Sequence, residues 1–330
     1  MKPDQQSIDP STMTVDPLIH VAPSPHLAST ANTTRRMMID VLLALAPVIV
    51  AAVYFFQLSA VYQLVICVAG CLAAEALFVT MRGKPLTLID MSAAVTGVIL
   101  ALSLPGTAPW YVGFIASFVA IGIGKVLFGG LGMNIFNPAM VGRAFVMIAF
   151  AGAMAASGYE DSASTVDVMS QATPLTAFKQ GGVTTSLSAL FYGTTNGSLG
   201  ETCALACLLG GIYLCLRRTA SWEIPAGVII AVLVLGGIGD LLNPGTEWTV
   251  LHHLFGGALL FGAFFIATDP VTSPLTPRGK FIFGCGVGAL IMLLRVFSGY
   301  PEGVMFAVLL MNAVTPLINR WTIPTPFGGK

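Results

Sequence analysis

The sequence predicts an all-α integral membrane protein with about ten transmembrane helices. Of its 330 residues, 55% are hydrophobic and only 9% are charged, whereas charged residues make up about a quarter of a typical soluble domain. The apolar residues form continuous runs, and most of the runs are long enough to cross ~30 Å of hydrocarbon as a helix. We therefore expect spanning helices rather than a β-barrel.

The predicted spans follow one another along the chain, with one long polar connection between the fifth and the sixth. The third opens at Asp90 and closes at Leu104-Pro105-Gly106, the fifth follows Asn137-Pro138, and the eighth closes near Thr268. Irregular backbone at such places has to be buried in protein or line a cavity. We expect the spans at 36–57, 61–81, 89–104, 109–128, 139–156, 202–216, 222–241, 251–267, 280–298 and 303–320.

The distribution of Lys and Arg predicts the orientation. If the N-terminus is cytoplasmic, Lys179 is the single such residue in an outer loop, and the positive-inside rule is satisfied. Both termini would then be cytoplasmic, and the loop with Thr173 would be periplasmic in a bacterial inner (cytoplasmic) membrane. The predicted cytoplasmic cations are Arg35, Arg36, Arg82, Lys84, Arg217, Arg218, Arg278, Lys280, Arg320 and Lys330.

The spans divide into two sets of five that are weakly similar to each other. Lys125-Val126 in the first half matches Arg295-Val296 in the second, and Phe136 matches Phe306. An odd number of spans per half forces the second half to insert upside down, which is the inverted-repeat design of many carriers. We expect a flexible cytoplasmic leader at 1–34, a first repeat at 35–156, an external loop at 157–201, a second repeat at 202–320 and a cytoplasmic tail at 321–330.

Polar side chains near the fifth span are candidates for a binding site. Asn134 and Asn137 are three residues apart, so they can share one helical face and offer both donors and acceptors to a heterocycle such as a flavin. A helix cap at Asn137-Pro138 is the alternative for the second of these residues, and it leaves Asn134 unexplained. Arg143 lies inside the span and needs an anionic partner, either a cofactor phosphate or a carboxylate.

Other functional classes find little support in the sequence. Asp40, Glu75 and Asp90 lie near the inner ends of spans, where an ionisable group is either functional or an interfacial cap. The six cysteines fall in apolar stretches without a complete ligand set, so we expect packing residues and no metal site. We expect no hydrolytic catalytic residues and no nucleic-acid partner.

The loop around Thr173 is the main polar excursion of the chain. A threonine hydroxyl is a weak nucleophile, so a phosphoester on it would require a separate transferase, and small neighbours such as Ala172 would leave it accessible. From loop chemistry alone, an ordinary loop threonine is the favoured interpretation.

Resemblance to a known family reverses that preference. The chain resembles the D subunits of the Rnf electron-transport complex, and the related B subunits of the sodium-pumping NADH:quinone reductase, from about residue 35 to 320. One departure is Gln171, where the family often has Gly. The similar segments are Asp167-x-x-Ser170-x-Ala172-Thr173, Gly132-Met-Asn134-Ile-Phe-Asn137-Pro-Ala-Met-Val-Gly-Arg143, Thr268-Asp269-Pro-Val-Thr272-Ser273-Pro and Gly299-Tyr-Pro-Glu302-Gly.

The resemblance implies a flavoprotein. A flavin transferase would join FMN through its phosphate to Thr173, with Asp167, Ser170 and Ala172 as the recognition motif. Asn134 and Asn137 would contact a second, non-covalent flavin (riboflavin). Asp269, Thr272 and Ser273 would lie near a flavin.

The implied function is electron relay in an ion-translocating ferredoxin:NAD oxidoreductase, coupled to Na⁺ or H⁺ movement. The implied partners are the A, B, C, E and G types of Rnf subunit, especially the outer-face FMN subunit, together with the flavin transferase and membrane lipid. Two alternatives stay open. An inverted-repeat solute channel or transporter would carry no covalent flavin, and a cofactor-free scaffold subunit would tolerate Thr173→Ala.

Overall fold

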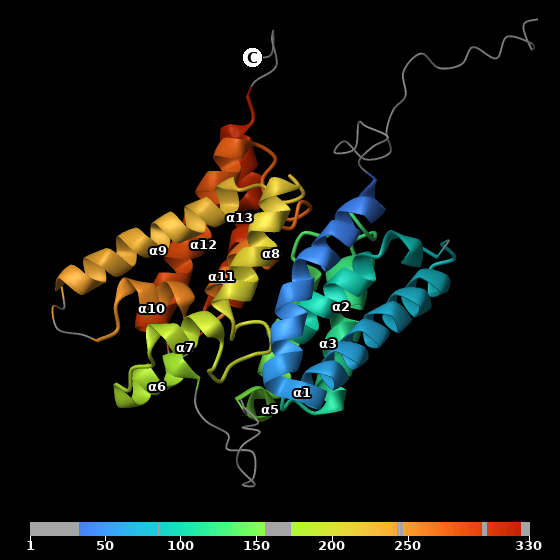
Figure 1. Ribbon diagram of the computed structural model, residues 1–330. Coiled ribbons are helices and arrows are strands. Elements are labelled where there is room, and N and C mark those ends of the chain that lie inside the picture. The colour runs from blue at the N-terminus through green and yellow to red at the C-terminus, as the bar shows by residue number, and fades with distance from the viewer. Residues whose placement is uncertain are drawn as a thin grey trace, which may run out of the picture.

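The computed structural model describes residues 33–84, 86–155, 173–242, 244, 247–298 and 302–324. These residues are arranged in helices and connecting turns, without a named strand. In Figure 1, α1, α2 and α3 form one group, and α9, α12 and α13 form another. Helix α8 packs on α1 between the two groups. Each predicted apolar stretch coincides with a helical segment.

The longest helix, α1 (Thr34–Met81), is two helices joined at Gln57. Its 48 residues would extend ~72 Å at 1.5 Å per residue, more than twice the hydrocarbon thickness. Gln57 has φ 49° and ψ −128°, which no helix contains, and the chain reverses there. Figure 1 shows the two arms running in opposite directions. The arms correspond to the predicted spans 36–57 and 61–81.

The rest of the first half is made of shorter helices. After η2 (Leu88–Asp90), α2 (Ser92–Ser103) is buried along its whole length. Helix α3 (Trp110–Ile121) continues into η3 (Gly122–Val126), a π-helical turn. The predicted span 139–156 is interrupted at Phe150, which separates α4 (Pro138–Ala149) from α5 (Ala151–Ala155).

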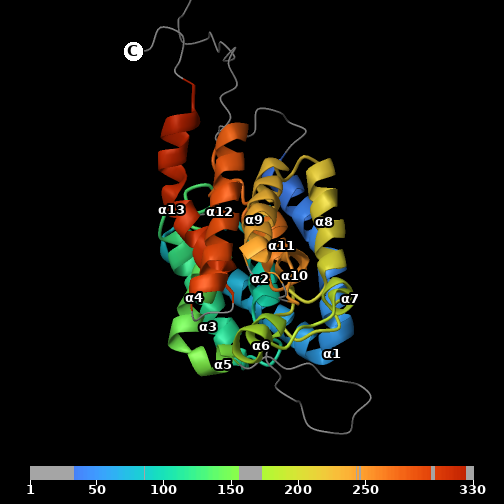
Figure 2. The same ribbon diagram turned by 90° about the vertical axis from the view of Figure 1, so that its left-hand side faces the viewer.

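The connecting segment 157–201, expected to be a loop, contains two short helices. These are α6 (Pro174–Gly181) and α7 (Leu187–Tyr192). Phe178 of α6 stacks on Trp248 of the second half, with ring centroids 4.6 Å apart, and Leu190 of α7 is buried. Figure 2 shows α6 and α7 at the end of the molecule opposite the C-terminus.

The second half repeats the alternation of long and broken helices. Helices α8 (Ala204–Leu216) and α9 (Glu223–Leu242) are followed by a broken segment made of α10 (Val250–Phe255), α11 (Leu259–Phe261) and η4 (Gly262–Ile266), which is also π-helical. Helices α12 (Pro277–Phe297) and α13 (Val304–Thr322) complete the described chain.

Among the described residues, four helices are long and apolar enough to cross a membrane by length and composition. They are α1, α9, α12 and α13, and four shorter apolar segments accompany them. Many large apolar side chains on these helices are exposed, among them Tyr54, Leu235 and Phe297. An exposed apolar surface of this extent is typical of a protein surrounded by lipid or partner helices. The protein is therefore a helical membrane protein.

Candidate functional site

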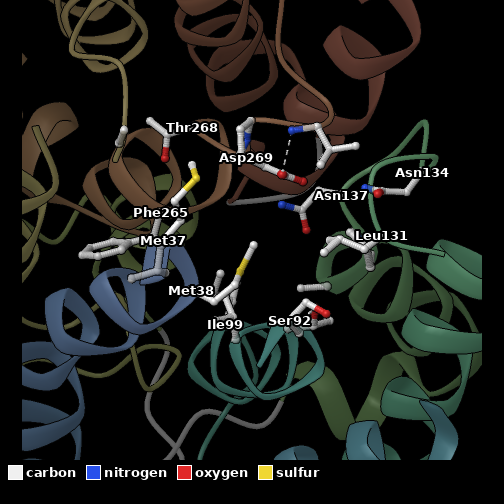
Figure 3. Close-up of a pocket in the computed structure, with 18 of the residues that line it drawn as sticks. Met37, Met38, Ser92, Ile99, Leu131, Asn134, Asn137, Phe265, Thr268 and Asp269 are labelled. Carbon is white, nitrogen blue, oxygen red and sulfur yellow. Dashed lines mark hydrogen bonds between the residues drawn. The ribbon is translucent and has the colours of Figure 1, made fainter. Parts of the chain in front are cut away.

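A pocket with a largely apolar lining and a few polar side chains lies where the two halves meet, and we call it the central pocket. It encloses about 810 Å³ of space not filled by atoms, counting the part open to the surroundings. The start of α1, the start of α2, the end of η3 and the segment after η4 all contribute to its walls. Figure 3 shows its labelled residues: Met37, Met38, Ser92, Ile99, Leu131, Asn134, Asn137, Phe265, Thr268 and Asp269.

Asn137 has a structural task in this wall. Its Oδ1 accepts a hydrogen bond from the Met140 N–H at 3.3 Å, and Pro138 occupies the first helical position of α4. Its Nδ2 donates to the Ile266 carbonyl at the end of η4, at 3.2 Å. The helix-cap interpretation of Asn137 is therefore confirmed, and its amide also ties the first half to the second.

Asn312 of α13 completes this tie. Its Oδ1 accepts the backbone N–H of Asn137 at 3.2 Å, and its Nδ2 donates to the Thr272 carbonyl at 3.2 Å. Thr315 also donates to that carbonyl, at 3.0 Å. The buried Asn312 side chain, which is 1% exposed, thus joins the start of α4 to the turn after η4.

Asn134 has unused hydrogen-bonding capacity. Its Nδ2 donates to the Phe136 carbonyl at 3.3 Å, while its Oδ1 accepts no hydrogen bond from the described residues. The side chain lines the central pocket and the residue is 6% exposed. A ligand with an N–H or O–H group can donate to this oxygen, so Asn134 is suited to bind one.

The segment after η4 contributes Asp269 to the central pocket. Its Oδ1 accepts from the Val271 N–H at 3.1 Å and its Oδ2 from the Thr272 hydroxyl at 3.2 Å, so the carboxylate also stabilises the turn. Thr272 and Ser273 are buried, each 3% exposed, and they lie behind the pocket wall rather than in it.

Lys125 in η3 is a pocket residue that the sequence analysis missed. Its Nζ lies 2.6 Å from Glu75 Oε1 and 2.6 Å from Ser92 Oγ, and the side chain is 3% exposed. Ser92 in turn donates to Asp90 at 2.6 Å. The sequence does contain a signal for this pair, since it places a lysine inside one apolar span and a glutamate inside another. A charge buried in a membrane protein has to be paired.

Thr173 lies in a second, smaller region, which we call the Thr173 pocket. The residue is half-buried and caps α6: its Oγ1 accepts from the Thr176 N–H at 3.3 Å and lies 2.8 Å from the Thr176 hydroxyl. The pocket encloses about 260 Å³ of space not filled by atoms, counting the part open to the surroundings. Its other lining residues include Asn196, Glu201 and Glu302. The Phe178–Trp248 stack holds α6 against the second half and so fixes this cap.

Arg143 belongs to the Thr173 pocket region and not to the central pocket. Its Nη2 lies 3.6 Å from Glu201 Oε1, so the neighbouring carboxylate is its partner. In the sequence, Arg143 and Asn134 fall in one motif because they are nine residues apart along the chain. About half of the twelve-residue helix α4 separates them in space, since Asn134 precedes α4 and Arg143 lies midway along it.

Glu201 is the most perturbed acid near Thr173. Burial raises the pKa of its carboxyl, the nearby Glu302 carboxylate raises it further, and Arg143 at 3.6 Å opposes both without outweighing them. Glu302 is held separately, by the Ala258 N–H at 2.8 Å and by Arg295 Nη2 at 3.6 Å. The pKa of the Glu201 carboxyl is therefore above that of an ordinary glutamate.

The other motif residues cannot be placed. Asp167, Ser170 and Ala172 lie outside the described residues, so the predicted recognition motif is represented by Thr173 alone. The structure thus separates the predicted site residues into a central pocket with Asn134, Asn137 and Asp269 and a Thr173 pocket bordered by Arg143 and Glu201.

The fold and the two pockets define the class of the protein, a helical membrane protein with broken helices, and comparison with known proteins gives the family. The model of the NQR2, RnfD, RnfE family matches residues 20–328, so the chain belongs to this family. It is 41% identical to the D subunit of the ion-translocating oxidoreductase complex of Sodalis glossinidius, over 91% of this chain and 96% of that protein.

Two further relatives have more specific names. The D subunit of the proton-translocating ferredoxin:NAD(+) oxidoreductase complex of Clostridium ljungdahlii is 41% identical, over 94% of this chain and 96% of that protein. The D subunit of the Na(+)-translocating ferredoxin:NAD(+) oxidoreductase complex of Acetobacterium woodii is 39% identical, over 93% and 95% of the two chains. Similarity therefore extends across nearly the whole of each chain.

Proposed function

We propose that this chain is the flavin-bearing electron-relay subunit of an ion-translocating ferredoxin:NAD oxidoreductase complex, with FMN joined to Thr173 as a phosphoester. Membership of the family and the names of the relatives support the assignment to such a complex. The proposal that the chain bears FMN rests on the position of Thr173. It ends the Asp167-x-x-Ser170-x-Ala172-Thr173 motif and caps a helix at a partly open pocket.

The residues around Thr173 fit a phosphoester. Within the described chain, Thr173 Oγ1 has its two contacts with Thr176 and none with an acidic group, so substitution on this oxygen breaks no ion pair. The first-turn N–H groups of the eight-residue helix α6 and its dipole favour an anion at this end. Bound FMN would supply reversible electron transfer, and the chain's contribution is to place and tune it.

The central pocket supports a site for the second, non-covalent flavin. Asn134 offers an unused acceptor there, Lys125 contributes an ammonium group paired with Glu75, and Asp269 and Thr268 add polar groups to a largely apolar lining. Mixed apolar walls with a few polar groups are typical of cofactor sites. Of the residues implied by resemblance, Asn134 is the one with free capacity, because Asn137 is committed to the helix cap.

The proposal includes the membrane arrangement: ten spans as two inverted five-helix repeats, both termini cytoplasmic, and Thr173 periplasmic. Two features support it. Each half contains one π-helical turn next to a break, η3 and η4, and α6 lies at the opposite end of the molecule from Thr34 and Thr322. The Rnf subunits of A, B, C, E and G type and a flavin transferase are the proposed partners.

Intact-protein mass spectrometry tests the covalent flavin. In cells that contain the flavin transferase, we expect the wild-type chain to carry a mass increment of one FMN and to fluoresce in a denaturing gel. Thr173→Ala removes the acceptor oxygen, so both signals should disappear. Thr176→Ala is the matched control, because it removes the neighbouring hydroxyl of α6 and leaves Thr173 intact.

An unmodified wild-type chain from such cells would contradict the proposal. That result would favour a solute transporter or a scaffold subunit. A mass increment that persists in Thr173→Ala and vanishes in Thr176→Ala would show that FMN is attached to Thr176 instead.

A further inference from the structure

An apolar groove lies between the end of α1 and the α3–η3 segment, and it shares no lining residue with either pocket. Phe78 and Phe118 contribute its aromatic wall, with ring centroids 6.1 Å apart, and Gly122 lies opposite them at the start of η3. The groove encloses about 1230 Å³ of space, counting the part open to the surroundings. None of the central-pocket or Thr173-pocket residues named above lines it.

The groove is shaped by a close approach of two helices. A Cβ at Gly122 would lie 2.7 Å from Phe78 Cε2, so the glycine lets the phenylalanine ring lie against the backbone of η3. Met81 and Leu127 flank the opening and are 73% and 69% exposed. An apolar channel with exposed apolar rims fits a hydrocarbon chain better than water or a polar solute.

Positive charge marks one end of this groove. Arg82 lines the groove and donates through Nη1 to the Val126 carbonyl, which holds the guanidinium at the opening. The Nη2 of Arg82 makes no contact with an acceptor among the described residues. Lys84, two residues further on, is exposed and is not ion-paired within the described chain. The nearest acids along the sequence are already engaged, Glu75 by Lys125 and Asp90 by Ser92.

We propose that this groove is a binding site for an anionic phospholipid. An acyl chain would lie along the apolar wall that Phe78, Phe118 and Leu127 help to form, and Arg82 would bind the phosphate, with Lys84 beside it. Arginine presents a planar fork that matches phosphate geometry, and basic residues at the cytoplasmic membrane surface attract anionic lipid. The inference depends on the membrane embedding of the chain and is independent of any flavin.

Native mass spectrometry of the purified full-length chain, with added dioleoylphosphatidylglycerol or dioleoylphosphatidylcholine, tests the site. Wild type should bind phosphatidylglycerol about fivefold more tightly than phosphatidylcholine. Arg82→Gln should abolish that preference, and Arg82→Lys should keep most of it. Arg278→Gln is the matched control, since it removes an exposed cation expected on the same side of the membrane and should leave the preference unchanged.

A second pair of variants probes the hydrocarbon part. Val119→Trp fills the groove from its wall and should weaken both lipids about equally, whereas Ile148→Trp, on the exposed face of α4, should weaken neither. Equal binding of the two lipids to wild type, or equal losses in Arg82→Gln and Arg278→Gln, would overturn the proposal. A photo-crosslinker at Ile123 distinguishes the occupants in the assembled complex, because a lipid adduct supports the site and an adduct to another subunit refutes it.

Discussion

At the scale of single residues, the two asparagines before the fifth span have different roles although they look equivalent in sequence. Asn137 uses its amide for the α4 cap and for the Ile266 carbonyl, whereas Asn134 keeps an acceptor in the central pocket. The three-residue spacing predicts a shared function. In the structure the two asparagines have different functions. Pro138 is the first residue of α4, so Asn137 directly precedes the helix and caps its N-terminus.

Substitution of these asparagines therefore has separable consequences. Asn134→Ala should weaken binding of riboflavin to flavin-depleted protein about tenfold, since one buried hydrogen bond to the ligand is lost, and it should leave the thermal midpoint nearly unchanged. Asn137→Ala should lower the midpoint, because the cap and the contact to η4 are lost. Fluorescence titration and thermal unfolding in detergent measure the two effects. Equal losses of affinity in both variants would contradict the assignment.

At the scale of elements, the helices pack through small residues. A Cβ at Gly210 of α8 would overlap the carbonyl oxygen of Ala44 in α1, and one at Gly142 of α4 would overlap the carbonyl of Ala116 in α3. Membrane helices have no hydrophobic drive to associate, so close backbone contact and the dispersion forces it allows become the main source of packing energy. The contact of α8 with α1 also joins the two halves, as does the contact of α4 with α13.

Gly210→Ala should consequently destabilise the protein. The methyl group has no space, and overpacking of this kind typically costs about 1–3 kcal/mol. Gly237→Ala is the matched control: it lies in α9 with no atom near its prospective Cβ, so it should be neutral or slightly stabilising. Thermal unfolding of the purified chains in one detergent compares the two, and a loss as large in Gly237→Ala would refute the packing argument.

The sequence predicts the elements better than their breaks. Continuous apolar runs identify every predicted helical stretch, because the need for internal hydrogen bonds in lipid leaves few other structures. The reversal at Gln57 is predicted as the boundary between the spans 36–57 and 61–81, although neither a glycine nor a proline marks it. Helices α6 and α7 are not predicted, because they fall in a segment whose apolar residues are too few to stand out. The Lys125–Glu75 pair joins residues 50 positions apart, and such a pairing depends on tertiary packing that periodicity does not encode.

At the scale of the whole molecule, both ends of the described chain lie on one side, and α6 lies on the opposite side. Figure 1 shows the beginning of α1 and the end of α13 at one side, and α6 and α7 at the other. The distribution of Lys and Arg predicts this separation, and that rule also predicts which side is cytoplasmic. The sequence could not predict how the halves interlock, because the contacts of Asn137, Asn312 and Arg217 all cross between them.

Labelling of introduced cysteines tests the orientation. Val183→Cys and Arg278→Cys are both at exposed positions near opposite ends of the molecule. A membrane-impermeant maleimide should label Val183→Cys in intact cells, and should label Arg278→Cys only after the membrane is permeabilised. The unmodified chain, whose cysteines lie in apolar stretches, provides the baseline. The reverse pattern would invert the proposed topology.

The Asn312 tie has a consequence for how such a protein can work. A carrier that exposes a solute first to one side and then to the other has to break the contacts between its halves in every cycle. Here Asn312 bonds to the start of α4 and to the turn after η4 at once, and Asn137 adds a third bond to Ile266. Electron tunnelling weakens steeply with distance, so bonds that hold the halves together would help to keep any two redox groups mounted on them at constant separation.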